Sequence, residues 1–130
     1  MQKEVVMGKK GREIVRLNIE ELIEDLTRAY ADEWLAHYYY TLAANLLQGI
    51  NSPEIAEKLR EISLSEYGHS NKLAERITEL GGEPLRAFAE VAQKAACPPF
   101  NMPRNPSDIP ALINAVLEQE RHAIETYQAL

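Results

Sequence analysis

The sequence has little of what marks secreted and membrane proteins. It contains one cysteine, Cys97, so no disulfide can form within the chain, as is usual in a reducing cytoplasm. It has no run of 18 apolar residues that would span a bilayer. Its N-terminus lacks the apolar core and cleavage site of a signal peptide. We therefore expect a cytoplasmic protein that makes no membrane contact.

Positive charge is also scarce. The chain of 130 residues carries a formal charge of −6, and its one basic cluster is "KKGR" at residues 9–12. An acidic body repels nucleic acid and attracts cations. We interpret the cluster as part of a short solvated tail, and DNA binding is the less favoured interpretation.

Strand-like alternation of useful length is absent, and helical signals divide the chain. Residues 1–17 are expected to form an N-terminal arm, and 18–130 a single helical domain. Asn18, with Glu21 three residues on, predicts the start of a first helix that ends near Gly49.

Three further helices are predicted. Pro53 favours the start of a helix over residues 52–80, which ends at two glycines. A short connecting helix is expected over 84–96, followed by a proline-rich loop. Asp108 is a candidate cap for a third long helix. Helices of about 30 residues, each roughly 45 Å long, pack at shallow angles. The fold class is therefore all-α, an antiparallel helical bundle.

Each long helix carries an apolar seam with 3,4 spacing, and a glutamate interrupts every seam near its middle. No seam carries Lys or Arg. The seam positions are Leu22, Leu26, Ala29, Glu33, Ala36, Tyr40, Ala43 and Leu47; then Ile55, Leu59, Ile62, Glu66, His69, Leu73, Ile77 and Leu80; then Ile113, Val116, Glu120, Ala123, Tyr127 and Leu130. Four polar residues thus point toward the predicted core.

Unpaired buried carboxylates are costly, which suggests a bound cation. Each costs several kcal/mol, against a stability of roughly 5–15 kcal/mol for a whole domain. Three carboxylates and an imidazole exceed the needs of one zinc site and suit iron or manganese, with room for two ions. Glu66 and His69 form a Glu-x-x-His pair, whose side chains share one helix face.

A less specific interpretation stays open for each feature. A lone seam glutamate is usually a boundary residue that reaches water, and a lone Glu-x-x-His is weak evidence. Their joint placement on three helices favours metal binding. Gly68 leaves room either for a site or for plain helix packing.

An internal repeat links the first and third long helices. "EWLAHYYY" at 33–40 and "ERHAIETY" at 120–127 both read Glu-x-x-Ala-x-x-x-Tyr. In the first copy Glu-x-x-His follows its glutamate by 33 residues, so a second is expected near position 153. We therefore expect a fourth long helix to be missing from this sequence.

These motifs resemble the ferritin-like superfamily. "ADEWLAHYYYTLAANLL" and "LSEYGHSNKLAERITELGG" are similar to the first two helices of bacterioferritins. The tyrosine run, the "ELGG" end, Cys97-Pro98 and "VLEQERHAIETY" resemble the archaeal and bacterial Dps-like, thioferritin-type branch over about residues 18–130.

The resemblance implies a di-iron site at Glu33, Glu66, His69 and Glu120, which would serve as both metal ligands and catalytic residues. It implies Fe(II) oxidation by peroxide or dioxygen, iron storage, and protection from oxidative stress. It also implies a cage-like homo-oligomer, a dodecamer. Manganese or zinc are alternatives for the same site.

Other residues depart from the branch or stay ambiguous. His122 stands where many members have a second cysteine, so no redox cysteine pair with Cys97 is expected. A flanking polar role for His122 is favoured over an extra ligand. Tyr40 is either an electron carrier or, on the favoured interpretation, a core aromatic. The rival functions are a rubrerythrin-like peroxidase, a manganese catalase, and a metal-free helical interaction domain.

Overall fold

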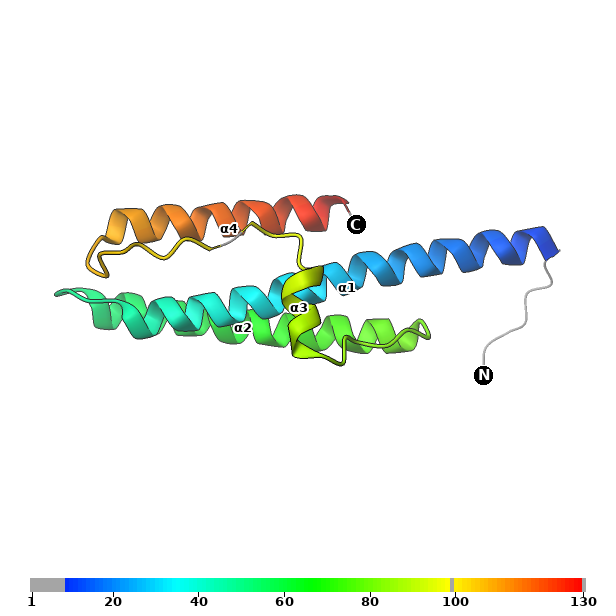
Figure 1. Cartoon of the computed structure of the whole chain (residues 1–130), viewed down its shortest axis with the longest axis horizontal. Coiled ribbons are helices and arrows are strands. Elements are labelled where there is room, and N and C mark those ends of the chain that lie inside the picture. The colour runs from blue at the N-terminus through cyan, green and yellow to red at the C-terminus, as the bar shows by residue number, and fades with distance from the viewer. Residues whose placement is uncertain (1–8, 99, 130) are drawn as a thin grey trace.

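The protein folds as a bundle of helices, seen in this computed structural model over residues 9–98 and 100–129, with side chains from residue 18 on. The helices are α1 (Lys9–Leu46), α2 (Ser52–Glu79), α3 (Phe88–Lys94) and α4 (Ile109–Ala129). No strand occurs among the described residues, so the all-α prediction is confirmed (Figure 1). None of the helices in this part of the chain is long and apolar enough to cross a membrane.

Helix α1 is longer than the sequence predicted. It begins at Lys9, so the expected start at Asn18 is wrong. Its first turns extend past the end of α2 in Figure 1. Asn18 therefore lies within a continuing helix and does not cap one. Residues 1–8, and the side chains of the "KKGR" cluster, lie outside the described residues. The division into an arm and a domain stays a prediction.

Helices α1 and α2 form the closely packed half of the molecule (Figure 1). Helix α2 has its proline at the predicted start and ends where Gly81 adopts a positive φ of 89°. At Gly82 a Cβ atom would stand 2.9 Å from Cγ2 of Ile23. The glycine pair thus ends α2 and lets the backbone pass close to α1.

The segment after α3 runs beside α1 and carries the chain to the start of α4. Asp32 accepts hydrogen bonds near the beginning of this segment, and the N–H of Gln48 donates to the Pro106 carbonyl near its end (3.0 Å). Phe100 is buried along the way, stacked on Tyr39 with ring centroids 5.8 Å apart. Figure 1 shows this loop running between α1 and α4.

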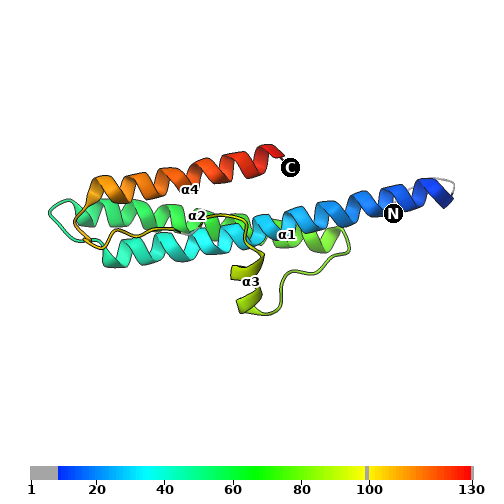
Figure 2. The same ribbon diagram turned by 45° about the horizontal axis from the view of Figure 1, so that its top comes forward.

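Helix α4 runs antiparallel to α1 and returns toward its middle (Figure 2). Asp108 caps it as predicted, because its Oδ1 accepts the N–H of Ala111 (3.1 Å). At about 1.5 Å per residue, eleven residues of α4 bring Glu120 back by roughly 16 Å. This return places Glu120 across from Glu33, and the two glutamates line the same cavity.

The apolar core lies between α1, the first half of α2, the loop and α4. Its buried members include Tyr40, Ala43, Leu47, Leu59, Phe100 and Leu112. The seam of α4 is less buried than predicted, because Ile113 is 49 % exposed and Tyr127 is 43 % exposed. Leu130 lies outside the described residues.

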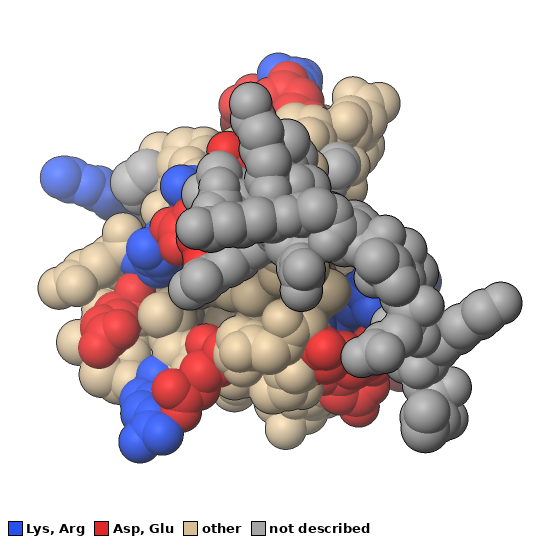
Figure 3. Space-filling model, turned by 90° about the vertical axis from the view of Figure 1, so that its right-hand side faces the viewer, with Lys and Arg blue, Asp and Glu red and all other residues tan. Residues whose placement is uncertain are grey.

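Acidic and basic side chains alternate on the end of the molecule shown in Figure 3. The described residues visible on that face form no broad patch of positive charge. One ion pair near the end of α2 joins Arg76 Nη1 to Glu79 Oε2 at 3.1 Å.

Candidate metal centre

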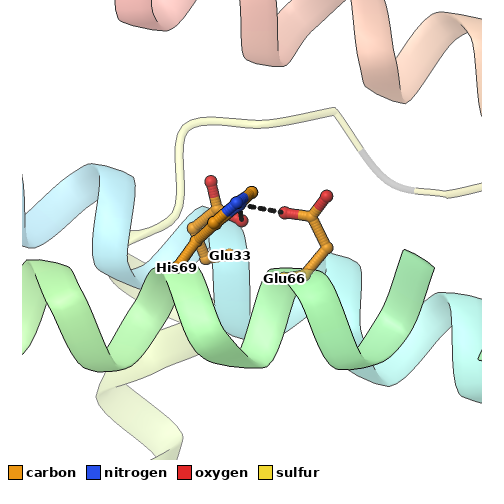
Figure 4. A group of neighbouring side chains, drawn as sticks. All are labelled: Glu33, Glu66 and His69. Atoms are coloured by element: carbon orange, nitrogen blue, oxygen red, sulfur yellow. Dashed lines mark ion pairs between the residues drawn. The ribbon is translucent and has the colours of Figure 1, made fainter. Parts of the chain in front are cut away.

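Three of the four predicted ligands converge midway along the α1–α2 pair. Glu33 projects from α1, while Glu66 and His69 project from neighbouring positions on α2 (Figure 4). His69 Nδ1 lies 3.6 Å from Glu33 Oε2 and 3.6 Å from Glu66 Oε2. One ligand atom from each residue lies within 4.8 Å of the other two. The two 3.6 Å distances are those of groups that share a metal ion, since two ligands each about 2.1 Å from an ion lie roughly 3–4 Å apart.

Glu33 is the most buried of the three. Its side chain is 5 % exposed, against 14 % for Glu66 and 49 % for His69. Its Oε1 accepts a hydrogen bond from the Tyr127 hydroxyl (2.6 Å), but its buried Oε2 has no hydrogen-bond partner among the described residues. Burial raises the pKa of Glu33, opposed by the Tyr127 hydrogen bond and by His69. The fold therefore holds an incompletely satisfied carboxylate.

Glu120 borders this cluster without joining it. It lines the same cavities as Glu33 and Glu66, yet it lies outside the group of mutually close ligand atoms. Its Oε1 accepts a hydrogen bond from the Tyr40 hydroxyl (2.8 Å). The structure thus brings together three of the four predicted residues and places the fourth across a cavity from them.

The two copies of the internal repeat are cross-linked by their tyrosines. Tyr40, in the copy that begins at Glu33, donates to Glu120; Tyr127, in the copy that begins at Glu120, donates to Glu33. Burial and the accepting glutamates raise the pKa values of both phenols above the ordinary value. Both tyrosines therefore stay protonated and act as donors at neutral pH. The repeat predicted these positions, but not their exchange of partners.

Two cavities adjoin the cluster. The smaller, of about 30 Å³, lies between α1 and α4, with Tyr40, Cys97 and His122 on its wall. The larger, of about 440 Å³, lies between α2 and α4, with Glu66, His69 and Glu120 on its wall. The glutamates are thus reached from the side where α2 and α4 stand apart (Figure 2).

Asp32 and Gln119, which the sequence did not single out, bind the loop next to the site. Each immediately precedes a repeated glutamate. Asp32 Oδ1 accepts the N–H groups of Ala96 (2.8 Å) and Cys97 (2.9 Å), and Gln119 Nε2 donates to the Pro98 carbonyl (2.8 Å). The available signal was a polar residue immediately before the first glutamate of each repeated motif.

Cys97 and His122 also lie at this level. Burial, with a contribution from the Asp32 carboxylate, raises the pKa of the Cys97 thiol to about 12, so the thiol stays neutral. A neutral thiol is a poor nucleophile. His122 Nε2 lies 3.6 Å from Asp32 Oδ2 and 3.3 Å from the Thr126 hydroxyl. These contacts account for His122 as a polar neighbour of the cavity.

The chemistry of the cluster fits a borderline metal ion. It presents carboxylate oxygens and one imidazole nitrogen, the donors that iron, manganese and zinc take in proteins. The orphaned Glu33 oxygen faces the other donors, as an ion in their midst would require. No Lys or Arg is among the residues that line either cavity. The residues present therefore fit a cation better than they fit an empty core.

The chain is similar in sequence to two curated proteins. The chain is 35 % identical over 111 residues to the DNA protection during starvation protein of Pyrococcus furiosus, a match covering 85 % of this chain and 60 % of that protein. It is 38 % identical over 64 residues to a bacterioferritin of Desulfovibrio desulfuricans, covering 49 % of this chain and 36 % of that one. The chain thus spans 60 % or less of the length of these curated relatives.

A solved structure is similar over nearly the whole chain. It is a dodecameric thioferritin, the bacterioferritin-related protein from Bacteroides fragilis, with a TM-score of 0.80 and 28 % identity; the match covers 94 % of this chain and 73 % of that one. The ferritin-like domain matches residues 23–130. These residues include the whole cluster and both copies of the repeat, and the chain belongs to the ferritin-like family.

Proposed function

We propose that this chain oxidises Fe(II) and takes part in iron storage, with Glu33, Glu66, His69 and Glu120 as ligands of a di-iron centre. The observation that carries the proposal is the Glu33 carboxylate. It is buried, one of its oxygens lacks a hydrogen bond, and that oxygen faces Glu66 and His69. Burying a carboxylate in this way costs stability unless a cation neutralises it.

The residues of the cluster take distinct roles in this proposal. His69 Nδ1 faces both carboxylates, so Nδ1 of the neutral ring is the ligand atom. Glu66 lies about one turn before His69 on α2 and borders both cavities, the position expected of a bridging carboxylate. Glu33, on the opposite helix, is a terminal ligand. Bound iron supplies the one-electron redox change that peroxide or dioxygen draws on.

Glu120 completes the set from the far side. Its carboxylate is tied to Tyr40 in this structure, so ligation by Glu120 requires a shift of its side chain. The matching tyrosine on the other glutamate stays in place as a donor to Glu33 Oε1 and leaves Oε2 for the ion. Tyr127 therefore orients the free oxygen of Glu33 toward the other donors, whereas Tyr40 holds Glu120 in the position from which it must shift.

The surroundings of the cluster support access and storage. The cavity of about 440 Å³ beside Glu66 and His69 gives Fe(II) and a small oxidant a path to the ligands. Large apolar side chains stand exposed on α1, α2 and α3, including Tyr38, Leu64 and Phe88. Such side chains favour self-association, and the thioferritin neighbour is a dodecamer. We infer a cage-like homo-oligomer that holds the oxidised iron and withdraws Fe(II) from damaging reactions.

Aerobic iron loading tests the proposal. Fe(II) is added to the purified chain with dioxygen or with peroxide, Fe(III) absorbance is followed, and protein-bound iron is counted after gel filtration. We expect oxidation faster than in buffer and more than two irons retained per chain. Glu66→Ala should abolish the acceleration, while Glu57→Gln, at an exposed site on the same helix, should retain it.

Other outcomes separate the rival functions. Stoichiometric metal with steady peroxide turnover and no accumulation would assign the chain to the peroxidases or catalases. A chain that binds no iron, and whose thermal unfolding is unchanged by Fe(II), would be a helical interaction domain, and the proposal would then be rejected.

A further inference from the structure

The short segment Ala96–Pro98, called the strap below, is fixed between α1 and α4 at the level of the cluster. Asp32 holds its backbone from the α1 side through the N–H groups of Ala96 and Cys97, at 2.8 and 2.9 Å. Gln119 holds it from the α4 side through the Pro98 carbonyl, at 2.8 Å. Three short hydrogen bonds thus join the two helices through one stretch of backbone.

The two anchoring side chains are largely withdrawn from water. Gln119 is 8 % exposed and the Asp32 side chain 14 %. A carboxylate that accepts two backbone N–H groups makes strong, charge-assisted bonds. A buried amide that spans a fixed gap is directional. Neither side chain belongs to the cluster of ligand atoms, so the mechanism proposed above leaves both without a role.

Each anchoring residue is the immediate neighbour of one of the two repeated glutamates. Asp32 precedes Glu33 and Gln119 precedes Glu120, so each anchor shares a rigid helical turn with a glutamate. Fixing the anchors to one strap fixes the separation of the two turns. The same separation is required by the crossed hydrogen bonds of Tyr40 to Glu120 and of Tyr127 to Glu33.

The rest of the loop holds the strap in place from one side. Phe100 stacks on Tyr39 and meets the ring of Tyr40 edge-on, with centroids 5.9 Å apart. The strap is therefore part of a packed layer and cannot slide along α1 without opening the core.

We propose that Asp32 and Gln119 are positioning residues that act through the strap to set the spacing of Glu33 from Glu120, and hence the width of the candidate metal centre. The spacing itself is independent of what the centre binds. Its effect on iron chemistry rests on the proposed function.

The test uses two readouts, one of which needs no metal. In protein labelled with [¹³Cζ]tyrosine, the Cζ shifts of Tyr40 and Tyr127 report their hydrogen bonds to the glutamates, after assignment with the two phenylalanine variants. Co²⁺ titration in visible light reports the affinity and geometry of the cluster. The variants are Asp32→Ala, Gln119→Met and the double variant, with Asp32→Asn as the conservative change that keeps an acceptor oxygen.

If the proposal holds, Asp32→Ala and Gln119→Met each move both tyrosine shifts toward the value of exposed Tyr38. Each also weakens Co²⁺ binding about 10–100-fold, the usual effect of losing an outer support of a metal ligand. Because both anchors act through one strap, the Co²⁺ dissociation constant of the double variant should be within about two-fold of that of the single variant that binds Co²⁺ more weakly. Asp32→Asn should restore most of both signals.

A core variant, Ile77→Ala, separates positioning from general destabilisation. Ile77 is 0 % exposed, lies about two turns beyond His69 on α2 and is outside the core cluster that holds Tyr40 and Phe100, so its loss should lower the melting temperature and leave both readouts unchanged. Should Asp32→Ala fail to fold, Gln119→Met decides the question alone. Unchanged tyrosine shifts in Gln119→Met would overturn the proposal. A wild type that binds no Co²⁺, with shifts that still respond, would reject the proposed function and support the positioning role.

Discussion

Replacing Glu33 by glutamine should stabilise the metal-free protein while it abolishes metal binding. Glutamine keeps an oxygen to accept the Tyr127 hydrogen bond and removes the charge that burial disfavours. Because burial raises the pKa of Glu33, the folded state holds the proton more tightly than the unfolded state. Stability is then greatest below the ordinary pKa of 4.5 and falls as pH rises from 4.5 toward the raised pKa of the folded state.

Protonation limits how far the buried Glu33 carboxyl group can lower the free energy of unfolding. A carboxyl of ordinary pKa 4.5 can be protonated at about 1.4 kcal/mol per pH unit above that value. Because the folded protein can protonate Glu33 instead of burying its charge, Glu33 lowers the free energy of unfolding by at most about 3.4 kcal/mol at pH 7 and about 0.7 kcal/mol at pH 5. For a domain of this size roughly 1 kcal/mol corresponds to 4 °C, so the largest expected shifts in melting temperature are about 14 °C and 3 °C.

Thermal unfolding in the presence of a chelator measures the effect. Wild type and Glu33→Gln are compared at pH 5 and pH 7, with Glu57→Gln as the control that makes the same charge change at an exposed site. The gain from Glu33→Gln should be clear at pH 7 and small at pH 5. The control should stay within about 0.5 kcal/mol of wild type at both.

Two results would refute this reasoning. A gain of equal size at both pH values would mean that relief of a buried charge is not its source. A loss of stability at pH 7 would mean that the carboxylate is better satisfied in the metal-free fold than its unpartnered oxygen indicates. Either result would also remove the main argument for a cation at the cluster.

Three further predictions concern neighbouring features. Tyr127→Phe removes the donor to Glu33 and should lower metal-free stability by about 1 kcal/mol in urea titrations. Co²⁺ at 100 times its dissociation constant should add about 2.7 kcal/mol, seen as a rise in melting temperature that chelation reverses and that His69→Ala lacks. Gly82→Ala should lower the free energy of unfolding by about 1–3 kcal/mol, because the added Cβ would meet two isoleucine side chains. Gly68→Ala should raise it by about 0.5–1 kcal/mol, because the added Cβ would meet nothing within 4 Å. Calorimetry measures both changes.

Sequence periodicity predicted the fold well where local signals decide it. The start of α2 at a proline, its end at two glycines and the Asp108 cap of α4 are each set by one or two residues, and all three are confirmed. The start of α1 was predicted wrongly. A capping residue such as Asn18 favours a helix start, but it does not prevent the preceding residues from continuing the same helix.

The candidate site was predictable in part for the same reason. Glu66 and His69 are one turn apart on α2, so helical spacing alone places them together, and seam position places Glu33 opposite them. Glu120 depends on how α4 docks, which the loop decides. Spacing along the chain carries no information on that docking, so the hydrogen-bond partners of Tyr40 and Tyr127 could not be predicted from the sequence.

The two sides of the centre are therefore held by different forces. Glu33, Glu66 and His69 stand on helices that pack along most of their shared length, so their relative placement is fixed by the core. Glu120 stands on α4, which meets α1 through apolar residues such as Leu112 in its first half, through the loop and through two tyrosine hydroxyls. Glu120 can approach the other ligands by a side-chain movement that breaks its hydrogen bond with Tyr40, while Glu66 and His69 keep their places on α2. Any adjustment of the candidate centre to one ion or two is therefore expected on the α4 side, beside the larger cavity, where the tyrosine hydrogen bonds are the contacts to be exchanged.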